Sequence, residues 1–390
     1  MERIIYQTSD NQDWNDLSVR KTFANKTAIF QNKGNAIDKN MKDTRSSWLA
    51  WYSIICLVFV VVSSTVQSQD VHFSQFSQTP LLVNPALTGL FRGDNRATLH
   101  YKNQWKSIGA PFKTYALSYD MSILKNKWDQ GYLGVGFYAF SDKAGDSQLS
   151  TTQMNLSVSG IVAVDDANTI SLGLQGGFAQ RSINSSALQW GNQFDKGNFD
   201  ASLASQETNV FSPFTHGDFS AGLNWHYVVD KLLMTNAGIA LYHVNNPRQE
   251  FITSSSEQLY SKIVGYIDGQ IGLSNNNLSI LPSILYLNQG PATELTFGAM
   301  LRYRLKEESR YTGYIKETAL SFGGHYRNGD SFIPSILLEV ANYALGISYD
   351  INVSKLNTVS SGRGGVEISL RFVNPNPLRR GGSKQGPSFL

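Results

Sequence analysis

The stretch TQMNLSVSGI, residues 152–161, alternates apolar and polar side chains. Met154, Leu156 and Val158 would lie on one face, and small uncharged polar side chains would lie on the other. Period two is the signature of a β-strand, because successive side chains leave opposite faces of the strand. An uncharged polar face suits the lumen of a barrel better than bulk water. The stretch therefore predicts a strand that lies between lipid and a polar interior.

Similar alternation recurs along the chain and defines about fourteen segments. An even number of strands is usual for bacterial outer-membrane barrels. No segment shows convincing helical periodicity. We therefore expect an all-β chain folded as a transmembrane antiparallel β-barrel of about 14 strands. The expected strands lie near residues 96–102, 112–121, 131–140, 152–161, 168–178, 217–228, 232–242, 262–272, 278–287, 294–305, 318–326, 331–340, 343–350 and 365–372.

The composition favours a membrane barrel over a soluble β protein. Charged residues make up 16% of the 390 residues, aromatic residues make up 12%, and there are 33 glycines. The mean hydropathy of −0.23 is too polar for a bundle of membrane helices. These values are typical of a chain that faces lipid with every second residue. A soluble sandwich or propeller is the alternative, but no repeat of roughly 40–50 residues indicates a propeller. The net charge of +3 does not indicate a nucleic-acid partner.

The apolar run Trp48–Val62 follows Lys42 and Arg45 and precedes small residues. This order predicts a secretory signal peptide over residues 41–68, cleaved before Gln69. The run is shorter than the roughly 20 residues of a membrane-spanning helix, although an uncleaved anchor is the alternative. The single cysteine lies inside this run. We therefore expect a mature chain without disulfides or thiol chemistry.

The rest of the chain divides into four parts. Residues 1–40 are polar and precede a second possible start at Met41, so we expect a misassigned or disordered extension. Residues 69–95 would form a periplasmic N-terminal segment, and residues 96–372 would form the barrel. Residues 373–390 are rich in Pro, Gly and basic side chains, which predicts a flexible tail. Contact of this tail with a periplasmic partner is the alternative.

The N-terminal segment QDVHFSQFSQTPLLVNPALTG, residues 69–89, resembles neither of its neighbours. Asn84-Pro85 blocks continuation of a strand or helix, because proline lacks a donor and restricts its predecessor. Gly89 can adopt a turn that leads into the first strand. The segment is either a plug of the barrel or a docking strand for periplasmic secretion components. As a plug it would bury four apolar side chains in the lumen: Phe73, Phe76, Leu81 and Leu82.

Two long connections, residues 179–216 and 243–261, are expected on the outer side of the membrane, since outer loops are the longer ones in such barrels. The first is rich in large aromatic side chains, which exposed loops normally avoid. The second opens with a turn fixed by Asn-Pro. These loops either bind a partner or simply pack against the barrel. The candidate partner-binding residues are Trp190, Phe194, Phe199, Phe211, Phe214, Asn246, Pro247 and Arg248.

The sequence contains no catalytic pattern. The six histidines lack the HExxH spacing, and no GxSxG motif is present. The run GLQGG, residues 173–177, lacks a phosphate-binding pattern, and glycine in a strand more often marks a bend or a crowded wall. Asp165 and Asp166 are adjacent carboxylates that point apart, a poor start for a metal site. We therefore expect no enzyme, no cofactor and no metal.

Taken together, ten short motifs resemble the PorP/SprF family of Bacteroidetes outer-membrane proteins, which are linked to type IX secretion and gliding. Each motif is weak alone, but they recur in order across nearly the whole mature chain. Residues 1–40 and 373–390 lie outside the resemblance. The motifs are HFSQFSQ (72–78), VNPALTG (83–89), YKNQW (101–105), GAPF (109–112), the loop 142–145, LQWGNQFD (188–195), HVNNPRQEF (243–251), GGHYR (323–327), GISYDINVSKL (346–356) and GVEISL (365–370).

The resemblance implies a non-enzymatic outer-membrane barrel of fourteen strands. Its implied partners are outer-membrane lipid, type IX secretion components and an exported adhesin or the C-terminal sorting domain of that adhesin. Its implied role is to help this large protein cross the membrane or remain attached at the surface. No nucleic acid or small-molecule substrate is expected. The alternative is a transport barrel that conducts small or hydrophobic solutes.

Overall fold

A computed structural model describes the barrel and the segment that precedes it. The expected extension 1–40, the signal peptide 41–68 and residue Phe211 lie outside the described residues, as does the tail beyond residue 374. The described residues are 70–105, 109, 111–125, 127–128, 130–184, 188–195, 197–206, 212–229, 233–249, 257–273, 277–307, 317–355 and 357–374.

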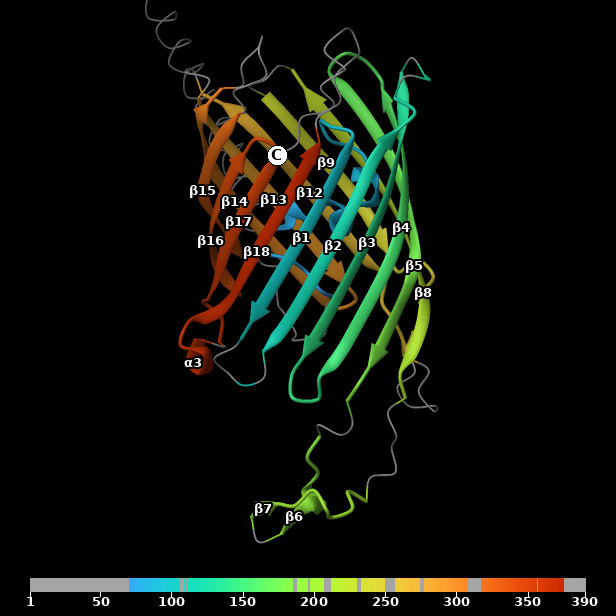
Figure 1. The fold of residues 1–390 in the computed structure, drawn as a ribbon, viewed down its shortest axis with the longest axis vertical. Coiled ribbons are helices and arrows are strands. Elements are labelled where there is room, and N and C mark those ends of the chain that lie inside the picture. Colours follow the sequence, from blue (N-terminus) through green and yellow to red (C-terminus); the bar gives the residue numbers. More distant parts are fainter. Residues whose placement is uncertain are drawn as a thin grey trace, which may run out of the picture. The chain divides into compact units, whose positions relative to one another are not determined.

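Fourteen antiparallel strands close into one barrel, which confirms the predicted fold class and strand number (Figure 1). Neighbours in the sequence pair around the barrel, and β1 pairs with β18 to close it. The strands are β1 (Asn95–Gln104), β2 (Phe112–Ile123), β3 (Gly131–Ala144), β4 (Leu149–Ala163), β5 (Asn168–Ser182), β8 (Phe214–Val228), β9 (Leu233–Tyr242), β12 (Lys262–Gly272), β13 (Leu278–Gln289), β14 (Ala292–Lys306), β15 (Thr318–Arg327), β16 (Ser331–Val340), β17 (Tyr343–Asn352) and β18 (Arg363–Asn374).

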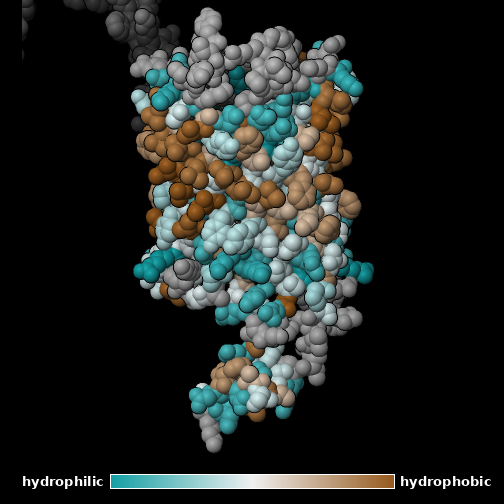
Figure 2. Space-filling view, viewed as in Figure 1, coloured by the Kyte–Doolittle hydropathy of each residue, from teal (hydrophilic) through white to brown (hydrophobic). Residues whose placement is uncertain are grey.

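The alternation in β4 separates the two faces of the wall as predicted. Leu156 is 66% exposed on the outer face, whereas its neighbour Ser157 is 1% exposed toward the lumen. Across the barrel, large apolar side chains that are exposed lie mostly at such outward positions. Figure 2 shows the result as an apolar band on the visible wall of the barrel. This band is the surface that a lipid bilayer would cover.

Several short helices and strands are not part of the barrel wall: some belong to the N-terminal segment in the lumen, and others belong to the connections between wall strands. Two short two-stranded sheets, β6–β7 and β10–β11, belong to the two long connections. The helical pieces in the described part of the chain, which the alternation did not predict, are at most four residues long. Among the described residues no helix is long and apolar enough to cross a membrane. These elements are η1 (Phe76–Gln78), α2 (Pro80–Val83), η2 (Pro85–Leu87), η4 (Gly191–Gln193), β6 (Phe194–Asp195), β7 (Asn198–Phe199), β10 (Arg248–Gln249), β11 (Glu257–Gln258) and α3 (Asn357–Ser360).

The two ends of the barrel differ in their connections. One end, here the long-loop end, carries the connections 183–213 and 243–261. The opposite end, here the short-turn end, carries the turns 124–130 and 164–167. The asymmetry is not complete, because the connection 307–317 also lies at the short-turn end.

The lumen contains the N-terminal segment, and we call its residues Asp70–Phe91 the plug. At the long-loop end, the Asp70 amide donates to Gln289 Oε1 at 2.9 Å. At the short-turn end, the chain leaves the plug beside the last strand, where the Asp94 amide donates to the Asn374 carbonyl at 2.9 Å. Residues 70–94 of the expected periplasmic segment 69–95 therefore follow the lumen from one end to the other before β1 begins.

The buried core lies between the plug and one side of the wall. Apolar side chains of the plug pack against aromatic and aliphatic side chains of β9, β12 and β13. The plug thus supplies the apolar surface that these lumen-facing strand positions need to be buried. The core residues are Phe76, Val83, Leu87, Leu90, Ile161, Ala240, Tyr242, Val264, Tyr266, Leu285 and Leu287.

Candidate functional site

The structure places three of the four apolar plug residues in fully buried positions. Phe73, Phe76 and Leu81 are at most 5% exposed, and Leu82 is partly buried. The Phe73 ring lies 4.9 Å from that of His100, centroid to centroid. The Phe76 ring meets His325 of β15 edge to face at 5.7 Å. Each aromatic ring therefore packs against a strand of the wall.

Asn84 and Pro85 start η2 and fix it to the wall. Pro85 is the first helical residue, where its missing N–H costs nothing. The Asn84 side chain caps the helix by accepting from the Ala86 amide at 2.8 Å. Its amide group donates to the carbonyls of Leu223 and Ile239 at 3.0 and 3.2 Å. One fully buried side chain thus joins the plug to β8 and β9.

Gly89 ends this part of the plug in a left-handed conformation, with φ of +69°. A Cβ at this position would lie 2.6 Å from the Cα of Gly134, so a side chain would be excluded by space as well as by conformation. The Gly89 amide donates to Asp120 Oδ2 at 2.8 Å. Arg96 pairs with the same carboxylate at 2.7 Å and donates to the Leu87 carbonyl at 3.0 Å. The buried ion pair therefore holds the plug where the chain turns into β1.

Small residues on β3, β4, β5 and β8 form the surface on which residues 84–89 lie. A Cβ added to Gly173 would meet the backbone of Pro85 and Ala86, and one added to Gly222 would meet the Asn84 side chain. Between these glycines, Ser171 Oγ donates to the Ala86 carbonyl at 2.8 Å. The crowded wall expected from the glycines of residues 173–177 is found at Gly173. The plug therefore lies in backbone contact with this side of the barrel.

Charged side chains of the strands hold the other end of the plug. Glu367 Oε1 and Oε2 accept from the amides of Ser74 and Gln75 at 2.7 and 3.0 Å. Lys102 Nζ lies 3.2 Å from Glu367 Oε1 and also donates to the His72 carbonyl at 3.0 Å. The carboxylate is 1% exposed, so these donors replace its water shell. Residues 72–75 are thus recognised through their backbone.

A second cluster lies beside the first. Arg327 Nη1 lies 3.2 Å from Asp350 Oδ2, and Arg327 Nη2 donates to Ser74 Oγ at 2.6 Å. The Ser74 hydroxyl in turn donates to Asp350 at 2.9 Å. Arg327 Nε also lies 3.4 Å from Glu294 Oε1 of β14. We call Lys102, Glu294, Arg327, Asp350 and Glu367 the charged collar. The collar draws residues from five strands (β1, β14, β15, β17 and β18) and was not predicted from the sequence.

The first plug residue is held by a buried histidine. His243 follows β9 directly, and its Nε2 and Nδ1 lie 2.5 Å from Asp70 Oδ2 and 2.8 Å from Asp218 Oδ1. Burial opposes the charged ring, but the hydrogen bonds to Asp218 and Asp70 outweigh it and raise the pKa of His243 to about 9. Although burial of the carboxyl acts in the opposite direction, the hydrogen bond and charge of His243 hold the pKa of Asp70 well below its usual value. The imidazolium therefore bridges the plug and β8.

This bridge predicts a pH dependence of stability. A histidine whose pKa rises from 6.5 to about 9 on folding stabilises the protein fully below pH 6.5 and loses that contribution as the pH rises through about 9. The shift in the pKa of His243 corresponds to a contribution of about 3 kcal/mol to the free energy of unfolding. Unfolding free energies measured between pH 6 and 10 are expected to fall by about this amount in the wild type and to stay nearly flat in His243→Gln. Equal slopes for the two proteins would contradict this assignment.

The loop residues expected to bind a partner form two separate groups. In the first long connection, the Phe194 and Phe199 rings pair across β6 and β7 with centroids 5.6 Å apart, and both rings are exposed. Trp190 precedes η4 and is half-buried. Phe214 belongs to the wall, because it is the first residue of β8, where its ring stacks on His216.

The second long connection folds back on itself at the Asn-Pro turn. Asn246 has φ of +40° and donates to the Leu259 carbonyl at 3.1 Å. Pro247 is buried, and Arg248 is exposed in β10 opposite Gln258. Gln249 Oε1 accepts from Arg181 of β5 at 2.6 Å, which ties this turn to the barrel rim. Pro247 and Asn246 thus shape the loop, and Arg248 is free to meet solvent.

The described residues include no group of three or more His, Cys, Asp or Glu side chains that could hold a metal ion. The turn at Asp165 uses its carboxylate locally, because Oδ1 accepts from the Ala167 and Asn168 amides at 2.8 and 2.7 Å. In the lumen, side chains of the wall form hydrogen bonds with the polypeptide backbone of the plug. In the first long connection, aromatic side chains form an exposed apolar surface.

Comparison with known structures finds other membrane barrels. The toluene transporter TbuX of Ralstonia pickettii is 11% identical with a TM-score of 0.43, over 76% of this chain and 94% of that one. The CymD monoaromatic hydrocarbon channel is 10% identical with a TM-score of 0.41, over 79% and 95% of the two chains. BamA from Haemophilus ducreyi lacking POTRA domains 1–3 is 12% identical with a TM-score of 0.35, over 72% and 71%. At these values the likeness concerns the fold alone.

No curated protein matches the chain. Residues 65–372, which include the plug and nearly the whole barrel, match the family described as type IX secretion system membrane protein PorP/SprF. The match agrees with the resemblance drawn from the ten motifs. This chain therefore belongs to the PorP/SprF family of type IX secretion system membrane proteins.

Proposed function

We propose that this protein is a non-enzymatic component of the type IX secretion machinery that helps a large exported protein, an adhesin, to cross the outer membrane or stay attached to it. The family and the barrel fold support a position in the outer membrane. The barrel would act by binding the C-terminal sorting domain of its partner at the long-loop end. The short-turn end would then face the periplasm, where other secretion components meet it.

The single observation that carries this proposal is the plug. Apart from Ser77 and Leu82, its residues from Phe73 to Phe91 are buried, and their hydrogen bonds reach strands on several sides of the wall. A lumen occupied in this way favours a binding role over a wide solute channel. The exposed Phe194–Phe199 pair and Arg248 supply aromatic and charged groups of the kind that anchor protein interfaces.

A surface assay tests the proposal. Cells that carry Phe194→Ser and Phe199→Ser together are expected to lose one large surface protein while the barrel remains folded and present at its normal level. Lys143→Ser and Lys113→Ser, exposed at the same end of β3 and β2, form the matched control pair. A surface proteome that stays unchanged when the whole gene is deleted would contradict the proposal.

A transport barrel for small or hydrophobic solutes is the second candidate. A cavity of about 90 Å³ that remains beside the plug favours it. Purified protein in planar bilayers separates the two functions. Steady conductance or solute uptake by the wild type supports transport, whereas a silent barrel supports the binding role.

A further inference from the structure

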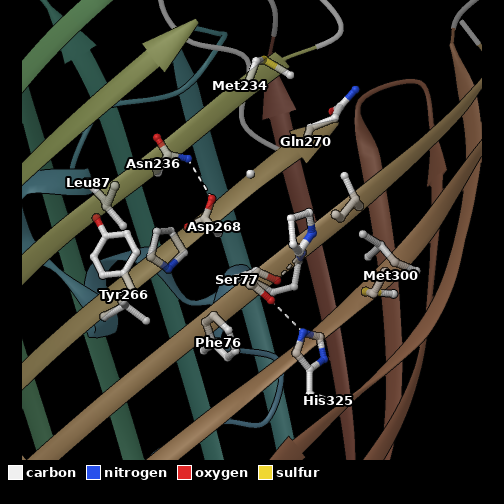
Figure 3. A pocket seen from close by; sticks show the side chains of 18 of the residues that line it. Phe76, Ser77, Leu87, Met234, Asn236, Tyr266, Asp268, Gln270, Met300 and His325 are labelled. Atoms are coloured by element: carbon white, nitrogen blue, oxygen red, sulfur yellow. Dashed lines mark hydrogen bonds between the residues drawn. The ribbon is translucent and has the colours of Figure 1, made fainter. Parts of the chain in front are cut away.

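A cavity remains in the lumen because residues 84–89 of the plug lie against β3, β4, β5 and β8, and the plug fills the space beside β9 and β12–β16 only in part. The cavity has a volume of about 90 Å³, several times what one water needs. Strands β9 and β12–β16 form its outer side, and plug residues from Phe76 to Leu90 close its inner side (Figure 3). Met234, the second residue of β9, pairs with Gln270 near the end of β12, so the cavity reaches toward the short-turn end.

Asp268 is the carboxylate of this cavity, and it lacks the paired cation that three other lumen carboxylates have. Its Oδ1 accepts from Asn236 Nδ2 at 2.8 Å, as Figure 3 shows. Within the described part of the chain Asp268 forms no ion pair. Arg96 also lines the cavity, but its guanidinium is committed to Asp120. Three lumen carboxylates are paired, in contrast: Asp120 with Arg96, Asp350 with Arg327 and Glu367 with Lys102.

Two further acceptors in the cavity wall are unused. His325 Nε2 contacts Ser283 Oγ at 2.8 Å, while His325 Nδ1 is buried and has no hydrogen-bond partner. Gln78 Oε1 is likewise buried without a partner, and the whole residue is 4% exposed. Buried polar atoms in folded proteins are nearly always paired, so unpaired acceptors beside a cavity are available to a water or a bound ligand. When the ring donates to Ser283 from Nε2, Nδ1 is an acceptor.

We propose that this cavity binds a small organic cation, a primary ammonium group on a short apolar stem. An ammonium carries three donors and no acceptor, so it can pair with the Asp268 carboxylate, and His325 and Gln78 are further acceptors in the lining of the same cavity. Its positive charge supplies the partner that Asp268 lacks. The stem would lie against the apolar side chains of Leu281, Met300 and Leu337. The ammonium comes either from a free amine or from a lysine side chain of a polypeptide at the short-turn end.

Charged thiol reagents test the site in the intact barrel. In a Cys56→Ser background, Met300→Cys places one thiol in the cavity wall. We measure the rate of the cationic methanethiosulfonate ethyltrimethylammonium over that of the anionic ethylsulfonate analogue, each rate taken relative to its rate with a free thiol in solution. This ratio is expected to be at least about ten, because a negative cleft concentrates cations. Asp268→Asn is expected to bring this ratio close to one. Asp142→Asn, which changes a lumen carboxylate at the long-loop end, is the matched control and is expected to leave the ratio unchanged.

Competition identifies the ligand and its source. n-Propylammonium is expected to slow the modification of Met300→Cys in the wild-type cavity and not in Asp268→Asn. Protection by propylammonium indicates a free amine, and protection only by a peptide containing lysine indicates a polypeptide. A reagent ratio near one in the parent protein, or no protection by either compound, would overturn the proposal. Neither readout depends on the secretion role, so the two proposals can fail separately.

Discussion

Replacement of Gly173 by valine is expected to displace the plug from the wall of the barrel. A Cβ at this position meets the backbone of Pro85 and Ala86, and a backbone cannot move aside as the end of a flexible side chain can. Overpacking of a tight contact costs about 1–3 kcal/mol even where the neighbours adjust. Here the neighbour is η2, which Asn84 also fixes to β8 and β9. We therefore expect a loss of about 3 kcal/mol or more in the free energy of unfolding.

Gly265→Val is the matched control, because Gly265 is a glycine of β12 with no heavy atom within 4 Å of its added Cβ. Urea titration of both variants in detergent gives the comparison. The bilayer conductance of Gly173→Val is also expected to exceed that of the wild type, since a displaced plug leaves the lumen open. Equal unfolding free energies for the two glycine variants would show that the plug does not depend on this contact.

The fold could be predicted because the determining signal is local. In β4, each outward residue faces lipid and each inward residue faces the lumen, so the period of two is visible in the sequence itself. Each of the fourteen expected ranges overlaps one observed strand. The sequence predicted the ends of the strands less accurately than their positions. Because β5 continues to Ser182 and β8 begins at Phe214, the first long connection is shorter than the expected 179–216.

The path of the plug could not be predicted in the same way. The sequence indicates that Asn84-Pro85 ends a regular element, but it does not indicate that Asn84 reaches carbonyls 139 and 155 residues away. The charged collar is equally non-local, because Ser74 meets Glu367 across 293 residues. From the sequence alone, Glu367 of β18 cannot be distinguished from a solvent-exposed charged residue, because its partners are known only once the order of the strands is known. Contacts of this kind follow from closure of the barrel and not from any pattern along one segment.

Loss of the Glu367 carboxylate is expected to have the second large effect. In Glu367→Gln, Lys102 keeps its buried charge but loses the partner 3.2 Å away. The new amide can accept from one of the two plug amides, while its NH₂ group faces the other donor. Removing one member of a buried ion pair typically costs about 3–5 kcal/mol, because the remaining charge is uncompensated. We expect a loss of this size in the unfolding free energy and earlier proteolysis at the amino end of the plug.

A double-mutant cycle separates the charge pair from the backbone contacts. Glu367→Gln combined with Lys102→Met removes both charges, so no unpaired buried charge remains. The free energy of unfolding of the double variant is therefore expected to be higher than that of Glu367→Gln alone. Glu257→Gln, an exposed glutamate of β11, is the control and is expected to change the unfolding free energy by less than about 0.5 kcal/mol. If the double variant is as unstable as the sum of the single ones, the two side chains act independently and the collar holds the plug through hydrogen bonds alone.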